Sequence, residues 1–178
     1  MNDPLPKADR QTLTRQDKAV ENAMNDIQEI YQMLNWKEPE EIQAKGIRLA
    51  KEIEDLSLLI LPSAAPSVWE CCARILSEKS DLALAPYLAR LLDWLRDLNW
   101  PGASIILDRL KKSPVEQLKE PFIVQFTHAK SLDNDEGQMW LDYLSELLDN
   151  EELKTLLPKP IIEDLQKHYH NWGFWREE

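Results

Sequence analysis

Residues 81–103 read DLALAPYLARLLDWLRDLNWPGA, and this stretch is the most informative about the fold. Leucines recur in it at steps of three and four residues, which places them on one face of a helix. These residues are Leu84, Leu88, Leu91, Leu95 and Leu98. Pro86 lies near the start of the segment, where the first turn of a helix tolerates proline. Pro101 follows Asn99 and Trp100, and because proline cannot continue a helix ladder, a tight junction is predicted there.

Helical spacing continues on both sides of this stretch. One helix is predicted to end at Asn35, and a second begins at Pro39. The second helix carries an apolar stripe of Ile42, Leu49, Ile53 and Leu56. Gly46 lies in a gap of that stripe, where it would let another helix approach closely. Toward the C-terminus further short helices are predicted, with a break near Pro121.

The predicted fold is all-α, because every predicted element is a helix. The helices are joined by turns of only a few residues. Short connections make neighbouring helices antiparallel, and stacked antiparallel pairs form a HEAT-like α-solenoid, a right-handed α-α superhelix. An internal echo gives this arrangement weak support, since Leu34-Asn35-Trp36 ends one helix and Leu98-Asn99-Trp100 ends another.

Two parts of the chain are expected to differ in order. Residues 1–14 contain Pro4 and Pro6 and no apolar periodicity, so we expect a flexible N-terminal arm. Residues 15–178 are expected to form a single helical domain, because this length suffices for one well-packed core. The chain has only four glycines, which disfavours a β-sandwich and a phosphate-binding loop.

The formal net charge of −11 limits the kinds of partner. Nucleic acids and anionic membrane surfaces are bound largely through Lys and Arg, so we expect neither nucleic-acid binding nor membrane binding. A basic partner would instead be attracted. Acidic charge also keeps small proteins soluble, and we give this simpler interpretation more weight than a partner selected by charge.

The chain is expected to be cytoplasmic. Its first twenty residues are polar and charged, without the apolar run of a signal peptide. The longest apolar stretch, residues 56–61, is too short to span a membrane. Cys71 and Cys72 are adjacent, and neighbouring cysteines rarely form a disulfide with each other. A disulfide-stabilised secreted protein is therefore not expected.

No motif for catalysis, a cofactor or a metal stands out. His168 and His170 are two residues apart, a spacing that points them to different faces of a helix. The two cysteines lie in an apolar segment, as core cysteines do, without the electropositive setting of a nucleophile. Asp93 and Asp97 lie one turn apart among arginines, which is typical of a solvated charged face. We expect no metal site, no cofactor and no catalytic residue.

The run from Pro86 to Ala103 resembles a family of small bacterial helical proteins that are catalogued as domains of unknown function. The family motif is a helix ending in W-L-x-D-x-N-W-P, and this chain carries it as WLRDLNWP at residues 94–101. The resemblance extends from about Val68 to Leu110. It implies a bacterial source and a HEAT-like helical fold, and it brings no known activity and no catalytic residues.

The seven tryptophans are the unusual feature of the composition. Trp94 falls on the leucine stripe, whereas Trp36 and Trp100 fall at helix junctions. Asp97 and Asn99 can bond the backbone groups that are left free at a helix end. We favour a structural role for the junction tryptophans, with interface use as the alternative, because tryptophan is common in binding hot spots.

The leading functional hypothesis is a non-catalytic protein-interaction module whose partner is a protein, and a basic one if charge selects it. The candidate interface residues are Asp97, Asn99, Trp100 and Trp36. The first alternative is an immunity-type inhibitor of a basic bacterial toxin. The second and least favoured alternative is an enzyme that uses Asp93, Asp97 and a histidine in an acidic groove.

Overall fold

The computed structural model describes residues 26–132 and 134–172 of the chain, with side chains described through residue 166. Within these ranges every regular element is a helix, which confirms the predicted all-α class. The arm predicted for residues 1–14 lies outside the described residues.

The α-helices are joined by short turns and by pieces of 3-10 helix. The first described helix covers residues 26–34. The later α-helices are α2 (Glu40–Lys51), α3 (Trp69–Ser77), α4 (Asp81–Leu84), α5 (Leu88–Leu92), α6 (Ala103–Leu110), α7 (Val115–Ser131), α8 (Asp135–Ser145), α9 (Glu151–Leu156) and α10 (Lys159–Trp172). The 3-10 helices are η1 (Leu56–Leu59), η2 (Pro66–Val68), η3 (Ala85–Tyr87), η4 (Asp93–Arg96) and η5 (Glu146–Asp149).

Several helices begin at a polar side chain that accepts a hydrogen bond from a backbone N–H group of the first turn. The Ser80 hydroxyl accepts from Ala83 at the start of α4, and the Asn134 carboxamide accepts from Gly137 at the start of α8. Asn150 does the same at the start of α9. Such caps stabilise a helix by about 1 kcal/mol each, so these polar residues fix where the helices begin.

The first described helix and α2 form the N-terminal helix pair, residues 26–51, and their contact differs from the prediction. The buried residues of α2 are Gly46 and Ala50, whereas Ile42 and Leu49 of the predicted stripe are 39% and 42% exposed. A Cβ atom at Gly46 would lie 2.7 Å from the Cβ of Met33. The predicted close approach at Gly46 is thus confirmed. The predicted stripe is wrong for the two members that lie on α2, whereas Ile53 and Leu56 beyond the end of α2 do pack in or against the core. Two helices in such close contact meet through their smallest residues, which pushes the larger side chains to the edge.

The leucine-rich stretch is helical from Asp81 to Arg96 but changes between α and 3-10 geometry three times, as α4, η3, α5 and η4. Pro86 lies in η3, where its missing N–H group interrupts the α-helical ladder. The predicted leucine face is confirmed, because Leu84, Leu88, Leu91 and Leu95 are all buried. The helix stops before Leu98, which is half-buried in the following loop.

The predicted break near Pro121 is wrong, since α7 runs through it as one helix of 17 residues. Proline inside a helix costs about 3 kcal/mol through the lost hydrogen bond and ring clash. The buried side chains of Leu118, Phe122 and Phe126 continue on both sides of it. Burial of this apolar face offsets the cost, so packing decides the structure here rather than local preference.

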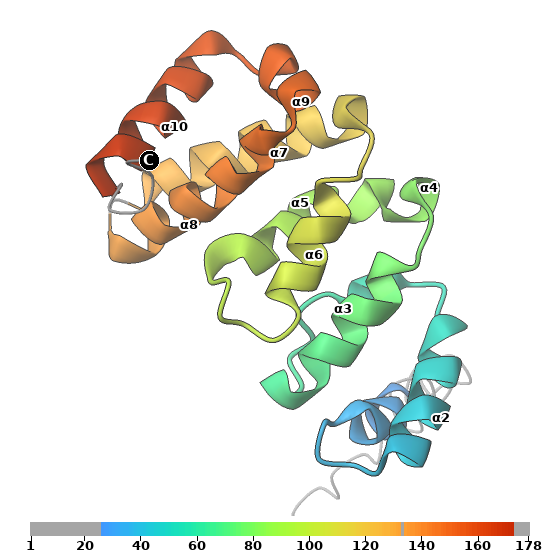
Figure 1. The fold of residues 1–178 in the computed structure, drawn as a ribbon. Coiled ribbons are helices and arrows are strands. Elements are labelled where there is room, and N and C mark those ends of the chain that lie inside the picture. The colour runs from blue at the N-terminus through green and yellow to red at the C-terminus, as the bar shows by residue number, and fades with distance from the viewer. Residues whose placement is uncertain (1–25, 133, 173–178) are drawn as a thin grey trace, which may run out of the picture.

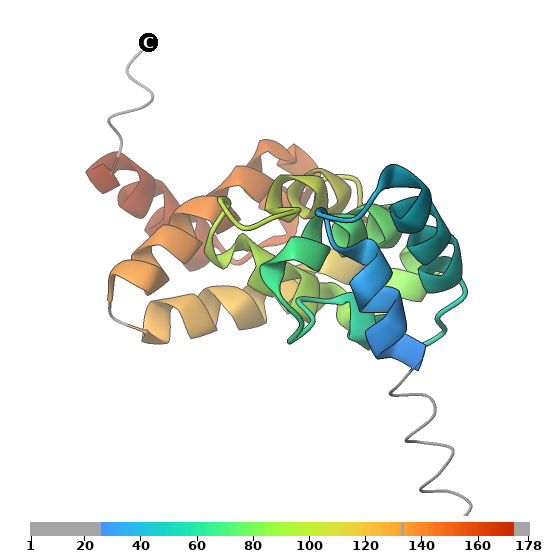
Figure 2. The ribbon, with the colours of Figure 1, turned by 90° about the horizontal axis from the view of Figure 1, so that it is seen from below.

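Packing follows the order of the helices along the chain at both ends of the stack, whereas in the middle α6 lies between α3 and α5. Helix α2 packs on α3, α3 on α6, α6 on α5, and α5 on α7. Helix α7 then packs on α8 and α9, and α8 packs on α10. The buried side chains belong to one hydrophobic cluster that extends from Ile27 to Leu165. Figure 1 shows the resulting elongated stack, and Figure 2 shows the first described helix and α10 at its opposite ends.

Candidate functional site

The loop that follows η4 closes on itself through Asp97. The Asp97 carboxylate Oδ1 accepts hydrogen bonds from the backbone N–H of Asn99 at 2.8 Å and from the Asn99 side-chain Nδ2 at 2.9 Å. The backbone N–H of Trp100 donates to the carbonyl oxygen of Asp97 at 3.0 Å. Asp97 therefore bonds a free backbone group at the helix end, whereas the Asn99 side chain bonds the Asp97 carboxylate.

The same loop is held in place by a hydrogen bond from Trp94 and by the close packing of Gly102 against α3. Trp94 is fully buried, and its indole Nε1 donates to the carbonyl oxygen of Pro101 at 3.0 Å. Gly102 has a left-handed φ of 82°, and a Cβ atom there would lie 2.4 Å from the Cβ of Ala73 on α3. Only glycine fits this position without strain or movement of α3.

Trp69, the first residue of α3, is the centre of an aromatic cluster with the tryptophans of this loop. Its ring makes T-shaped contacts with Trp100 at 5.5 Å and with Trp94 at 6.4 Å between centroids. Its Nε1 donates to the carbonyl oxygen of Pro62 at 3.0 Å. We call residues 94–102 together with Trp69 the tryptophan junction. Trp69 is not among the candidate residues from the sequence, because helical spacing carries no signal for contacts between distant residues.

Trp36 lies in the loop between the two helices of the N-terminal helix pair. Its backbone N–H donates to the carbonyl oxygen of Ser67 at 3.1 Å, two residues before Trp69. The Trp36 loop and the tryptophan junction therefore both meet the chain around the start of α3. Their aromatic rings differ, because Trp36 is 51% exposed whereas Trp100 is half-buried against Trp69. The structure thus brings Asp97, Asn99 and Trp100 into one turn and places Trp36 in an adjoining loop.

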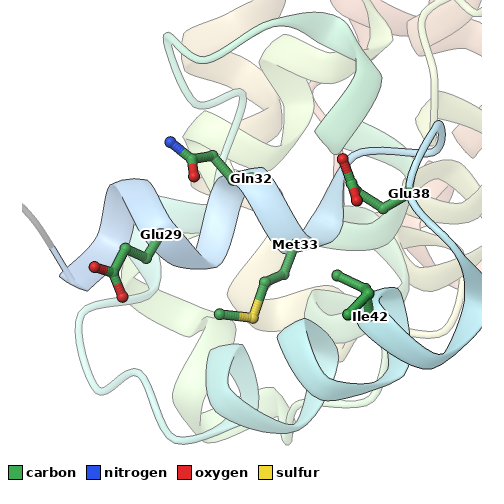
Figure 3. Close-up of a pocket in the computed structure, with 5 residues that line it drawn as sticks. All are labelled: Glu29, Gln32, Met33, Glu38 and Ile42. Atoms are coloured by element: carbon green, nitrogen blue, oxygen red, sulfur yellow. The ribbon is translucent and has the colours of Figure 1, made fainter.

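A pocket of about 380 Å³ lies between the first described helix and α2. Its lining residues are Glu29, Gln32, Met33, Glu38 and Ile42. Figure 3 shows the Met33 side chain extending from the first described helix toward α2, with its terminal methyl group pointing away from Ile42, and Glu29 and Glu38 on opposite sides of it. None of these residues is among the candidates from the sequence, where Ile42 was assigned to the packing face. The pocket arises because the close contact at Gly46 leaves Met33 and Ile42 at the edge of the helix pair.

Asp93 and Asp97, the acids of the enzyme alternative, have separate partners. The Asp93 carboxylate Oδ1 lies 3.3 Å from Nη2 of Arg96, as an ion pair. The Arg96 guanidinium also lies over the ring of Trp140, 4.4 Å from its centroid, and 3.5 Å from a carboxylate oxygen of Glu136. Asp97 is bonded within the loop. Both carboxylates therefore make structural contacts, in a charged network and in a turn respectively.

The two cysteines lie in the core on α3. Both side chains are buried and neither forms a disulfide. Burial raises the pKa of the Cys72 thiol to about 12, and it also raises the pKa of the Cys71 thiol. Both thiols therefore stay protonated at neutral pH, and a thiolate is the form that attacks a substrate.

Among the described side chains, no group of three or more His, Cys, Asp or Glu is arranged to hold a metal ion. His168 and His170 lie outside the described side chains. Across residues 26–132 and 134–172, no helix combines the length and the apolar character that crossing a membrane requires.

Comparison with known proteins identifies the family to which the chain belongs, but no individual protein that matches it. No curated protein and no solved structure matches the chain. The model of one protein family, described as a domain of unknown function and named DUF5071, matches residues 70–171, which is more than half of the chain. The match includes the tryptophan junction except Trp69, and it leaves out the N-terminal helix pair. The chain belongs to this family, the domain of unknown function DUF5071.

Proposed function

We propose that this protein is a non-catalytic protein-interaction module of the cytoplasm, built as a HEAT-like stack of helix pairs. The observation that carries the proposal is the exposure of Trp36. This residue is 51% exposed, although its backbone N–H donates a hydrogen bond to the carbonyl oxygen of Ser67. Tryptophan is enriched in the few interface residues that contribute most of the binding energy. A rigidly held, exposed tryptophan loses little conformational freedom when a partner covers it.

Other exposed apolar side chains support an interface on the N-terminal helix pair. Ile42 and Leu49 project at the edge of α2 and are 39% and 42% exposed. They are seven residues apart, so they lie on the same side of the helix. Trp36 is also exposed, so residues 36–49 present several apolar side chains among acidic ones such as Glu38. An interface core with a polar rim has this composition.

Asp97, Asn99 and Trp100 extend the proposed interface beyond the N-terminal helix pair. Asn99 is exposed, and the Trp100 ring is half-buried, so each offers part of its surface to a partner. Their fixed hydrogen bonds with the rest of the loop favour a preformed surface over one that orders on binding.

An immunity-type inhibitor of a basic bacterial toxin is the special case that the net charge of −11 favours. Such charge would attract a basic partner and speed its association. The enzyme alternative has less support, because Asp93 is paired with Arg96 and Asp97 is bonded within its own loop.

The test is to capture partners from a lysate of the source organism and then measure the binding of the identified partner with purified proteins. Trp36→Ala is expected to weaken that complex by about thirtyfold, as for an interface hot spot. Leu82→Ala is the matched control, since Leu82 on α4 is an apolar side chain that is 83% exposed. Equal affinities for Trp36→Ala and the unchanged protein would contradict the proposal. Trp100→Ala then measures how far the interface extends.

A further inference from the structure

We propose that the pocket of the N-terminal helix pair binds a basic segment of the partner protein. One aliphatic side chain of that segment would pack against Met33 and Ile42, and Lys or Arg side chains on either side of it would pair with Glu29 and Glu38. This inference rests on the proposed function and names the chemistry of the partner at the surface beside Trp36.

The floor of the pocket is apolar and fixed in place. Met33 is half-buried and Ile42 is 39% exposed, so both present hydrocarbon to solvent. The two helices approach closely beneath the pocket, because a Cβ atom at Gly46 would lie only 2.7 Å from the Cβ of Met33. A volume of about 380 Å³ is near the lower end of ligand pockets, which run from ~300 to ~1,000 Å³. It therefore suits a side chain and its neighbours rather than a large cofactor.

The rim of the pocket carries negative charge that the described protein does not neutralise. Glu29 and Glu38 are exposed, and neither forms an ion pair with a described residue. Some other exposed acids are paired, for example Glu78 with Lys51, whereas Glu116 and Glu120 on α7 form no ion pair with a described residue either. The combination of unneutralised acids with an apolar floor therefore distinguishes the pocket, not the acids by themselves.

The loop that carries Glu38 is held by its neighbour on α2. The Gln43 side chain donates to the backbone carbonyl oxygen of Glu38 at 2.6 Å, so this part of the rim is positioned without involving the Glu38 carboxylate.

This combination selects among the possible occupants. An apolar floor between two carboxylates that no described residue pairs is complementary to an aliphatic side chain flanked by cations. A second copy of this chain is a poor occupant, because two proteins of net charge −11 repel each other. The pocket lies in residues 29–42, whereas the family match begins at residue 70. We therefore assign the choice of partner to the N-terminal helix pair and not to the matched domain.

The test titrates the full-length protein with a capped peptide of sequence Gly-Lys-Lys-Leu-Lys-Lys-Gly and follows backbone amide resonances by NMR. The largest shifts are expected among residues 29–46. Glu29→Gln together with Glu38→Gln should raise the Kd about fivefold, because each exposed ion pair contributes modestly. The charge-matched control is Glu116→Gln with Glu120→Gln on α7, where both side chains are exposed, and it should change the Kd less than about twofold.

The apolar part of the pocket has its own variants. Ile42→Ser, or a peptide with glycine in place of the leucine, should each raise the Kd about fivefold, whereas Leu82→Ser should leave it unchanged. If the Glu29→Gln, Glu38→Gln protein and the Glu116→Gln, Glu120→Gln protein lose equal affinity for the peptide, the peptide is attracted by the overall negative charge. That result would overturn the proposal. Full affinity of the glycine peptide would also overturn it, and so would a homodimer that Ile42→Ser dissociates.

The same variants separate this inference from the proposed function. If the identified partner loses affinity with Trp36→Ala but binds normally to the Glu29→Gln, Glu38→Gln protein, the interaction module stands and the pocket assignment falls. If the peptide titration and the pocket variants behave as expected but Trp36→Ala leaves the identified partner's affinity unchanged, the pocket assignment stands and the proposed role of Trp36 falls.

Discussion

The tryptophan junction and the N-terminal helix pair both contain the sequence Leu-Asn-Trp, but the two regions place these residues in different surroundings. In the N-terminal helix pair, Leu34 is fully buried and Trp36 is 51% exposed. In the tryptophan junction, Leu98 is half-buried and the Trp100 ring packs against Trp69. The leucine is thus the core residue of the N-terminal helix pair, whose tryptophan is exposed, whereas in the junction the leucine and the tryptophan are both half-buried.

The difference follows from the contacts that hold each region together. The tryptophan junction is closed by aromatic rings whose N–H groups bond loop carbonyl oxygens, as Trp94 does with Pro101. The N-terminal helix pair is closed by the small residues Gly46 and Ala50, which leave larger side chains at the edge. We therefore expect substitutions in the junction to affect folding and substitutions at the edge of the helix pair to affect binding.

Trp94→Ala is expected to have the largest effect on stability. Removing a fully buried tryptophan leaves a large cavity and typically costs about 3–5 kcal/mol. The loss of the hydrogen bond to Pro101 adds to it, because the carbonyl oxygen is left without that donor. Urea unfolding followed by circular dichroism measures the change without relying on tryptophan fluorescence. Trp36→Ala is the paired substitution in the N-terminal helix pair. If it lowered the free energy of unfolding by more than about 1 kcal/mol, the expected difference between the two regions would be contradicted.

Gly102→Ala is expected to rank second, at about 2–5 kcal/mol. The left-handed φ of 82° costs an L-residue about 1–2 kcal/mol, and the contact of the new Cβ with Ala73 adds an overpacking cost of about 1–3 kcal/mol. Adding Ala73→Gly removes the shortest contact, at 2.4 Å, and leaves the backbone strain and the tighter-than-usual approach to the backbone of Trp69 and Glu70. Thermal unfolding should show partial recovery in the double variant, beyond the loss that Ala73→Gly produces alone. No recovery would mean that strain alone explains the cost.

The sequence predicted those features that depend on neighbouring residues. The spacing of Leu84, Leu88, Leu91 and Leu95 identified a buried helical face, and Asp97 bonds a backbone N–H group of its loop as expected. Each of these depends on residues a few positions apart. The family match was likewise anticipated by the motif at residues 94–101, which lies inside the matched range.

The sequence failed where contacts between distant residues decide the outcome. It indicated the larger side chains of α2 as the packing face, because periodicity does not show how closely Met33 approaches Gly46. A helix break was predicted at Pro121, because local helix propensity does not include the stabilisation from the apolar side chains that α7 buries on both sides of this proline. The pocket could not be predicted for the same reason, since Glu29 and Ile42 come together only through the contact of two helices.

The smallest expected effect is that of Leu49→Ser, which should change the free energy of unfolding by less than about 1 kcal/mol. Leu49 is 42% exposed, so the substitution removes only part of the apolar area that a core leucine would bury. Had the predicted stripe been the packing face, a cost of about 2–5 kcal/mol would be expected.

Ala50 is the next residue and is fully buried, so it provides the control at the same turn of α2. Ala50→Leu should cost about 1–3 kcal/mol, because the added carbon atoms have no room between the closely packed helices. Enlarging a small residue is thus expected to harm the protein more than removing a neighbouring large apolar side chain. The reverse order in urea unfolding would mean that Leu49 is part of the core, and it would remove the basis for assigning this edge of α2 to binding.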